Sequence, residues 1–168
     1  AWLSEQHQIP LELCQPAGAD WQINWSAPLL PSGQQHNATV LLTMAHVANT
    51  TGTIQNLPTT EVHSGPLQLY RIIDGAQSVG HLPVDVQQLA ADALVFPAHK
   101  GLAGPTGLGF IWLGARLRQL PLYGSRFGGN GQDSRSRLGP QSFPHWAEIG
   151  TPNLHGMLLL EPALDWLL

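Results

Sequence analysis

Lys100 is the only lysine among the 168 residues of the chain, and the other fixed cations are all arginines. It follows the apolar run 93–96 and precedes a glycine-rich turn, where backbone can approach a ligand closely. Removal of water beside such a run favours the neutral amine, which can attack a carbonyl carbon. We therefore expect Lys100 to form an imine with a carbonyl compound rather than to serve as a surface charge.

Asp74 follows a second apolar run, at 67–73, and precedes Gly75. An aspartate beside a pyridine nitrogen keeps the ring protonated and electron-withdrawing, and a lysine with such an aspartate is the recurring protein equipment for pyridoxal phosphate. Taken alone, Asp74 is better explained as a turn residue before a glycine. Together with Lys100 at the end of a neighbouring strand, it favours a site for pyridoxal 5'-phosphate (PLP).

Both residues need a scaffold that brings the ends of separate strands together. Apolar and β-branched residues fill 39–47, 67–73 and 93–96, and we expect strands there, the first of them buried on both faces of a parallel sheet. Helical patterns at 57–65 and 83–91 separate them, so the order predicts an α/β fold with a mostly parallel sheet and flanking helices. The run 109–113 follows too closely for a helical crossover and is expected to be one antiparallel strand. Ligands bind at the carboxyl ends of parallel strands, where the sequence has His46, Asn49, Asp74, Gln77, His99 and Lys100.

The remaining segments have weaker patterns. We expect residues 1–10 to be the end of a helix and 11–14 a short strand, with Cys14 in the core rather than acting as a nucleophile. Residues 15–37, rich in Pro, Gly, Ser and Gln, predict a connector. The stretch 117–138 is rich in arginine and glycine and is expected to be exposed and mobile. Asn153 is expected to cap a helix over 154–168.

The composition excludes some classes of function. Seven Lys and Arg against eleven Asp and Glu give a net charge of −4, which argues against nucleic acid because phosphates require a basic face. No apolar run approaches the roughly 18 residues that a membrane span needs, and a single cysteine fits a reducing compartment. We expect a cytoplasmic enzyme that has no metal site and no membrane partner.

Four motifs occur in order along the chain: HVANTTGT at 46–53, DGAQSVGHLPVDV at 74–86, HKGLAGPTG at 99–107 and EIGTPN at 148–153. Together they resemble the large domain of class V pyridoxal-phosphate enzymes, and within these the cysteine desulfurase and selenocysteine lyase branch. The resemblance covers about 11–168 and implies part of a fold type I PLP-binding large domain over 1–152. Residues 153–168 would begin a linker helix to a small domain, and the family's amino-terminal phosphate loop would precede this chain.

The resemblance implies roles for the residues of these motifs. Lys100 would form the imine with PLP and shuttle the α-proton of the substrate, while His99 would bind the cofactor phosphate. Asp74 would pair with the pyridine nitrogen, and Gln77 would donate a hydrogen bond to the phenolic oxygen. Asn49 would help to hold the carboxylate of the substrate.

Two further positions each have two interpretations, and a third departs from the family pattern. His46 is placed only as a lining residue of the substrate pocket, and a structural role at the strand end is equally well supported. Ser134 lies in the stretch 128–134, which resembles the segment that reaches the partner's phosphate across a homodimer, although a flexible surface loop is nearly as well supported. Pro97 stands where relatives carry Ser or Thr, so one hydrogen bond to the phosphate is lost, at a cost of about 1.5–3 kcal/mol.

The sequence thus predicts a fragment of a homodimeric PLP-dependent enzyme that acts on a small amino acid. Removal of sulfur from L-cysteine is the preferred reaction, with a sulfur-acceptor protein as a further partner. One alternative is a class V aminotransferase, or another PLP lyase or epimerase. A second, of another class, is a catalytically incomplete remnant that serves in dimerisation or cofactor binding.

Overall fold

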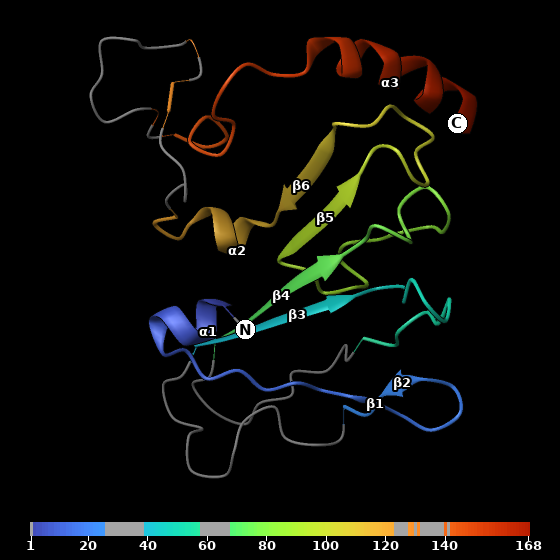
Figure 1. Cartoon of the computed structure of the whole chain (residues 1–168), viewed down its shortest axis with the longest axis vertical. Coiled ribbons are helices and arrows are strands. Elements are labelled where there is room, and N and C mark those ends of the chain that lie inside the picture. The colour runs from blue at the N-terminus through green and yellow to red at the C-terminus, as the bar shows by residue number, and fades with distance from the viewer. Residues whose placement is uncertain are drawn as a thin grey trace.

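The computed structural model describes residues 2–25, 39–57, 68–122, 128–129, 131, 140 and 142–168. Figure 1 shows a sheet across the middle of the molecule, with α3 along one side and the amino-terminal segment along the other. The elements are α1 (Trp2–His7), β1 (Pro16–Ala17), β2 (Gln22–Ile23), β3 (Thr39–Ala45), β4 (Gln68–Asp74), β5 (Ala93–Pro97), β6 (Gly109–Leu113), α2 (Ala115–Arg118) and α3 (Leu154–Leu167).

The main sheet has the strand order β3-β4-β5-β6. β3 runs parallel to β4 and β4 parallel to β5, whereas β6 is antiparallel to β5. The register pairs Asp74 with Ala45 on one side and with Val95 on the other, so the three parallel strands end at the same edge. The predicted mostly parallel sheet with one antiparallel strand is confirmed.

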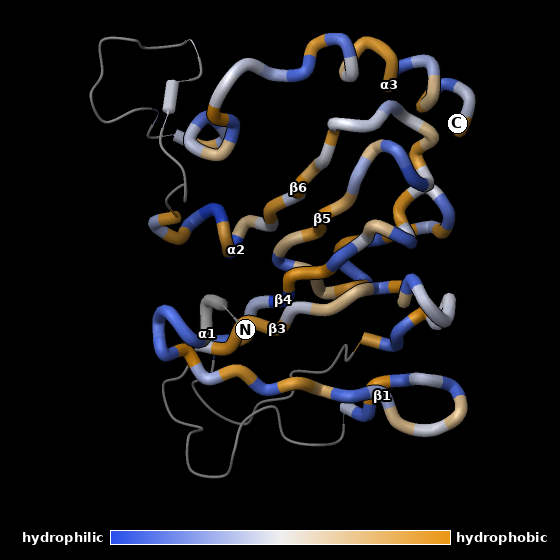
Figure 2. Tube along the Cα trace, viewed as in Figure 1, coloured by the Kyte–Doolittle hydropathy of each residue, from blue (hydrophilic) through white to orange (hydrophobic). Residues whose placement is uncertain are grey.

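Both faces of the sheet contribute to the core, because successive side chains of a strand point to opposite faces. On one face Tyr70 and Ala93 pack with Leu117 of α2. On the other face Ile73 is fully buried and its neighbour Leu94 is nearly so. Figure 2 shows hydrophobic residues along β4 and β5, in the middle of the sheet.

β3 is less buried than its sequence indicates. Its residues alternate between exposed and half-buried, and the side chain of Leu41 is 58% exposed. β3 is an edge strand whose partner in the described part of the chain is β4 alone. The expectation of burial on both faces is therefore wrong for the residues that the structure describes.

The helix expected at 83–91 is replaced by turns. Asp85 Oδ1 accepts hydrogen bonds from the backbone N–H groups of Gln87 and Gln88, which is typical of a helix start. Ala90, however, has a positive φ of 45°, which ends the helical path after one turn. The helix expected at 57–65 lies outside the described residues except for Leu57.

The amino-terminal segment also departs from expectation. Residues 11–14 form no strand, Leu13 is 75% exposed and Cys14 is an exposed free thiol, so the expected strand and the core position of Cys14 are wrong. Within the expected connector, β1 and β2 form a short antiparallel hairpin. The side chain of Gln55 fixes this hairpin to the segment after β3, because it accepts a hydrogen bond from Ile23 N and donates one to Trp21 O.

Expectations for the two helices after β6 have different outcomes. Asn153 caps α3 as expected, since its side chain accepts a hydrogen bond from Gly156 N at 3.0 Å. The expectation of exposure over 117–138 is wrong for Leu117, which α2 buries against the sheet, and most of that stretch lies outside the described residues. Among the residues described, no helix combines the length and apolar character of a membrane span.

Candidate active site

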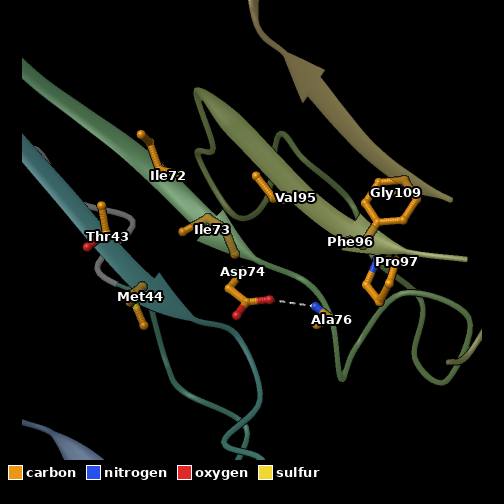
Figure 3. A pocket seen from close by; sticks show the side chains of 10 residues that line it. All are labelled: Thr43, Met44, Ile72, Ile73, Asp74, Ala76, Val95, Phe96, Pro97 and Gly109. Atoms are coloured by element: carbon orange, nitrogen blue, oxygen red, sulfur yellow. Dashed lines mark hydrogen bonds between the residues drawn. The ribbon is translucent and has the colours of Figure 1, made fainter. Parts of the chain in front are cut away.

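Asp74 is the last residue of β4, at the carboxyl edge of the sheet. Its Oδ1 accepts a hydrogen bond of 2.8 Å from Ala76 N, and Figure 3 shows this carboxylate between the ends of β3 and β5. The backbone on either side is held by the neighbouring strands, because Asp74 O accepts from His46 N at 2.9 Å and Gly75 N donates to Val95 O at 2.8 Å. The carboxylate is therefore fixed in place, while its Oδ2 accepts no hydrogen bond from the described residues.

A pocket with a volume of about 400 Å³ lies beside this carboxylate. Most of its lining is apolar, so a carboxylate within it can pair with a cationic or donor group of a ligand. Thr43 adds a hydroxyl that the four motifs do not indicate; its signal in the sequence is a polar residue within an otherwise apolar run. The lining residues are Thr43, Met44, Ile72, Ile73, Asp74, Ala76, Val95, Phe96, Pro97 and Gly109.

Gln77 and Asn49 are brought together by the same edge. Gln77 Nε2 donates a hydrogen bond to Asn49 Oδ1, although the two residues come from loops that follow different strands. The loop that carries Asn49 is closed by backbone bonds of 2.9 Å from Gly52 N to Ala48 O and from Ala48 N to Thr53 O. The structure thus places two predicted site residues in direct contact.

His46 is buried directly after β3. Its N–H donates to Asp74 O and its carbonyl accepts from Gln55 N at 2.8 Å. Its Nδ1 is buried and has no hydrogen-bond partner among the described residues. Burial lowers the pKa of His46 from its ordinary value, because desolvation disfavours the imidazolium. His46 does not line the pocket beside Asp74, and its contacts connect the β3 and β4 ends.

Lys100 and His99 follow the end of β5, on the edge that carries Asp74. Ala98, which precedes them, is fully buried and its N–H donates to Leu108 O at 3.1 Å. The turn closes through Ala103 N to Lys100 O and Gly104 N to Ala98 O, both 2.9 Å. Lys100 and His99 themselves are exposed. The burial that we expected for Lys100 is absent because no described residue covers its side chain.

Two other predictions have different outcomes. Pro97 lines the pocket and, as expected from its identity, supplies no hydroxyl there. Ser134 lies outside the described residues, so its predicted contact stays a prediction. Within the described ranges, no group of three or more His, Cys, Asp or Glu side chains is arranged to hold a metal ion.

Comparisons with known proteins agree with the motifs. The family model for aminotransferase class-V matches residues 20–168. A Haemophilus influenzae protein named "Probable cysteine desulfurase" is 38% identical over 137 residues, which are 77% of this chain and 30% of that protein. The chain spans about a third of the length of several curated relatives that it matches.

Solved structures show the same relationship. The cysteine desulfurase CsdA of Escherichia coli aligns with a TM-score of 0.60 and 32% identity, over 76% of this chain and 32% of that one. A C-DES mutant with glycine covalently linked to the PLP cofactor aligns with a TM-score of 0.55 and 28% identity, over 75% of this chain and 34% of that one. Because the family model covers most of the chain and the fold agrees, the chain belongs to the class V aminotransferase family.

Proposed function

We propose that this chain supplies much of a PLP site in an enzyme that removes sulfur from L-cysteine. The observation that carries the proposal is the arrangement at one sheet edge: a fixed carboxylate at Asp74, the Gln77–Asn49 amide pair, and Lys100 after the adjacent strand. The related C-DES structure holds PLP, and the other two relatives reported above are named cysteine desulfurase and probable cysteine desulfurase. Because the chain covers about a third of those relatives, the activity belongs to the whole protein.

The described residues fit the cofactor. Asp74 presents its Oδ2 beside an apolar pocket of about 400 Å³, which suits a flat pyridine ring whose nitrogen needs an anionic partner. Gln77 lies on the loop that directly follows Asp74; one N–H of its Nε2 donates to Asn49, and the second N–H would donate to the phenolic oxygen. When bound, PLP acts as an electron sink for carbanion chemistry at the α-carbon of an amino acid.

Lys100 and His99 would complete the binding of PLP. Lys100 supplies the primary amine that holds the aldehyde carbon, and this amine would also move the α-proton of the substrate. His99 supplies an imidazole donor for the phosphate, which matters more here because Pro97 has no hydroxyl. Both side chains are exposed, so they can reach a ligand above the sheet edge.

Asn49 would orient the substrate. Its Oδ1 accepts from Gln77, so its Nδ2 stays available as a donor to the substrate carboxylate. His46, buried behind this loop, would support the loop as a neutral imidazole rather than contact substrate.

The remaining parts of the proposal concern the whole protein. Residues 1–152 would form part of the PLP-binding large domain, and 153–168, which contain α3, would begin the linker helix to a small domain. A homodimer would bring Ser134 to the partner's phosphate. The exposed free thiol of Cys14 suits a reducing cytoplasm.

The test uses the fact that Lys100 is the only lysine. PLP is added to the purified chain at equal concentration, reduced with borohydride, and the labelled peptide is located by mass spectrometry. We expect one pyridoxyl group at Lys100, and a visible absorbance band that is missing in Lys100→Ala. Labelling divided equally between Lys100 and the amino terminus would show that the lysine has no privileged site.

The family description also favours an aminotransferase as a second candidate. Lys100 and Asp74 would have the same roles in that reaction, so they do not discriminate. Products do: with the whole protein and an added thiol reductant, which supplies the two electrons that release the sulfur as sulfide, equal amounts of alanine and sulfide from L-cysteine indicate desulfuration. A keto acid and amino-group transfer to a second substrate indicate transamination.

A further inference from the structure

Two loops at the sheet edge touch each other backbone to backbone. A Cβ added to Gly101 would lie 2.1 Å from Val79 O, and one added to Gly80 would lie 2.2 Å from Gly101 C. Real Cβ atoms essentially never come within 3.0 Å of such atoms. The chain therefore has no room for any side chain at either glycine, and Gly80 also has a positive φ of 84°.

Each of the two loops is closed by its own hydrogen bonds. In the loop after β4, Val79 N donates to Gly75 O at 2.9 Å and Leu82 N to Ser78 O at 2.8 Å. Ser78, inside this loop, is fully buried. The turn after β5, residues 98–104, is called the lysine turn. It is closed by the bonds to Lys100 O and Ala98 O described above. Two compact loops thus meet at one contact, one of them carrying Asp74 and Gln77 at its start and the other carrying Lys100.

The lysine turn is also held from α3. A Cβ at Gly104 would lie 2.6 Å from Leu160 Cδ1 and 3.2 Å from Ala98 Cβ, so α3 packs closely on the residues that follow Lys100. Asn153 Nδ2 donates to Gly107 O at 3.4 Å, a second link from the start of α3. Because these residues are packed, a displacement at Gly101 is transmitted to its neighbour Lys100 rather than absorbed further along the loop.

We propose that the contact of Gly101 with Val79 and Gly80 is a positioning device that sets the distance between the Lys100 amine and the Asp74 carboxylate. This inference rests on the proposed function, in which both groups act on one PLP molecule. Gly80 and Gly101 are positioning residues, since neither has a side chain that could touch the cofactor. An alanine at 101 must push the loops apart by roughly 1 Å, and a misplacement of that size costs about 100-fold in rate.

The chain offers matched controls for both glycines. Gly101→Ala is compared with Gly129→Ala, because Gly129 also lacks a positive φ and has nothing within 4 Å of an added Cβ. Gly80→Ala is compared with Gly52→Ala, because Gly52 has a φ of 70° and likewise has open space around it. Within each pair, both variants have the same free-energy cost of replacing glycine by alanine. They differ only in whether the added Cβ meets a close neighbour.

The first measurement needs no cofactor. Amide hydrogen exchange of the full chain is followed by mass spectrometry in increasing denaturant. In the wild type, the amides of Val79 and Leu82 and those of Ala103 and Gly104 should open with one common free energy, because the contact joins the two loops into one cooperative unit. Gly101→Ala should accelerate exchange in both loops at least 10-fold, and Gly129→Ala in neither.

The second measurement uses PLP. Gly101→Ala and Gly80→Ala should shift the absorbance maximum of bound PLP and slow PLP-dependent exchange of the substrate α-proton about 100-fold relative to the wild type. The two control variants serve in hydrogen exchange alone, because Gly129 and Gly52 lie in the segments that carry Ser134 and Asn49. Unequal opening free energies of the two loops in the wild type would overturn the inference, and this result is obtained even if Gly101→Ala fails to fold. If the wild-type chain binds no PLP at Lys100, the proposed function fails, and hydrogen exchange still decides whether the loops are coupled.

Discussion

The side chains of Gln77 and Asn49 are joined by a hydrogen bond across the carboxyl edge of the sheet, from Nε2 of the first to Oδ1 of the second. The bond links the loop after β4 to the loop after β3. In the proposed site it connects the residue that faces the cofactor with the residue that faces the substrate. Loss of either amide should therefore affect both ligands, though unequally.

Asn49→Ala tests the substrate side of this pair. The variant removes the Nδ2 donor to the substrate carboxylate, and a hydrogen bond to a charged group contributes about 1.5–3 kcal/mol. We expect KM for the amino-acid substrate to rise at least 10-fold while PLP binding stays within about 3-fold of wild type. Steady-state kinetics of the whole protein measure KM, and PLP titration measures the affinity for the cofactor. Thr50→Ala, in the same exposed loop, is the control; an unchanged KM in Asn49→Ala would remove this residue from the site.

Asp74→Asn tests the electron-sink role. Asparagine keeps the size of the side chain and an oxygen that can accept from Ala76 N, so folding and PLP binding should persist. The neutral side chain no longer favours a protonated ring, and loss of one electrostatic stabiliser costs about 100- to 1,000-fold in turnover. Deuterium exchange at the substrate α-carbon, followed by NMR, measures the loss. Asp165→Asn, an exposed carboxylate of α3, should have wild-type activity; equal rates in the two variants would contradict the assignment.

The positions of these residues at one sheet edge were predictable from the sequence, because runs of apolar and β-branched residues end directly before Asp74 and shortly before Lys100. Parallel pairing then determines which ends meet. The local surroundings were not predictable. The positive φ of Ala90 replaces a helix by a turn, and the exposure of Lys100 and of β3 depends on which elements cover them. Such coverage is a tertiary property that periodicity along one strand does not report.

His46 predicts a pH dependence of stability. Burial lowers the pKa of His46 in the folded chain below its value of about 6.5 in the unfolded chain. The unfolded state then binds more protons. His46 therefore costs the free energy of unfolding nothing above about pH 6.5 and lowers it as the pH falls below that value. Thermal unfolding between pH 7.5 and 5 should show this loss. The loss should shrink in His46→Gln and persist in His81→Gln, because His81 is exposed; equal pH profiles of wild type and His46→Gln would refute the link.

Asp92 lies at the edge of the sheet opposite the candidate site. We expect its replacement by alanine to lower the free energy of unfolding more than any substitution named above. Its buried carboxylate accepts from Arg71 N at 2.9 Å and pairs with Arg116 at 3.1 Å, and the Arg116 guanidinium lies over the Tyr70 ring at 4.8 Å. Asp92→Ala leaves the Arg71 amide without this acceptor inside the core and should cost about 3 kcal/mol in the free energy of unfolding.

Asp92→Asn separates the two contributions of this carboxylate. The amide oxygen can still accept from Arg71 N, so only the charge interaction with half-exposed Arg116 is lost. That interaction is screened by solvent, and we expect a loss of about 1 kcal/mol. Urea unfolding of the full chain gives both values. Arg118→Ala, on the exposed side of α2, should stay within about 0.5 kcal/mol of wild type. If Asp92→Asn costs as much as Asp92→Ala, the charge rather than the hydrogen bond to β4 stabilises this edge.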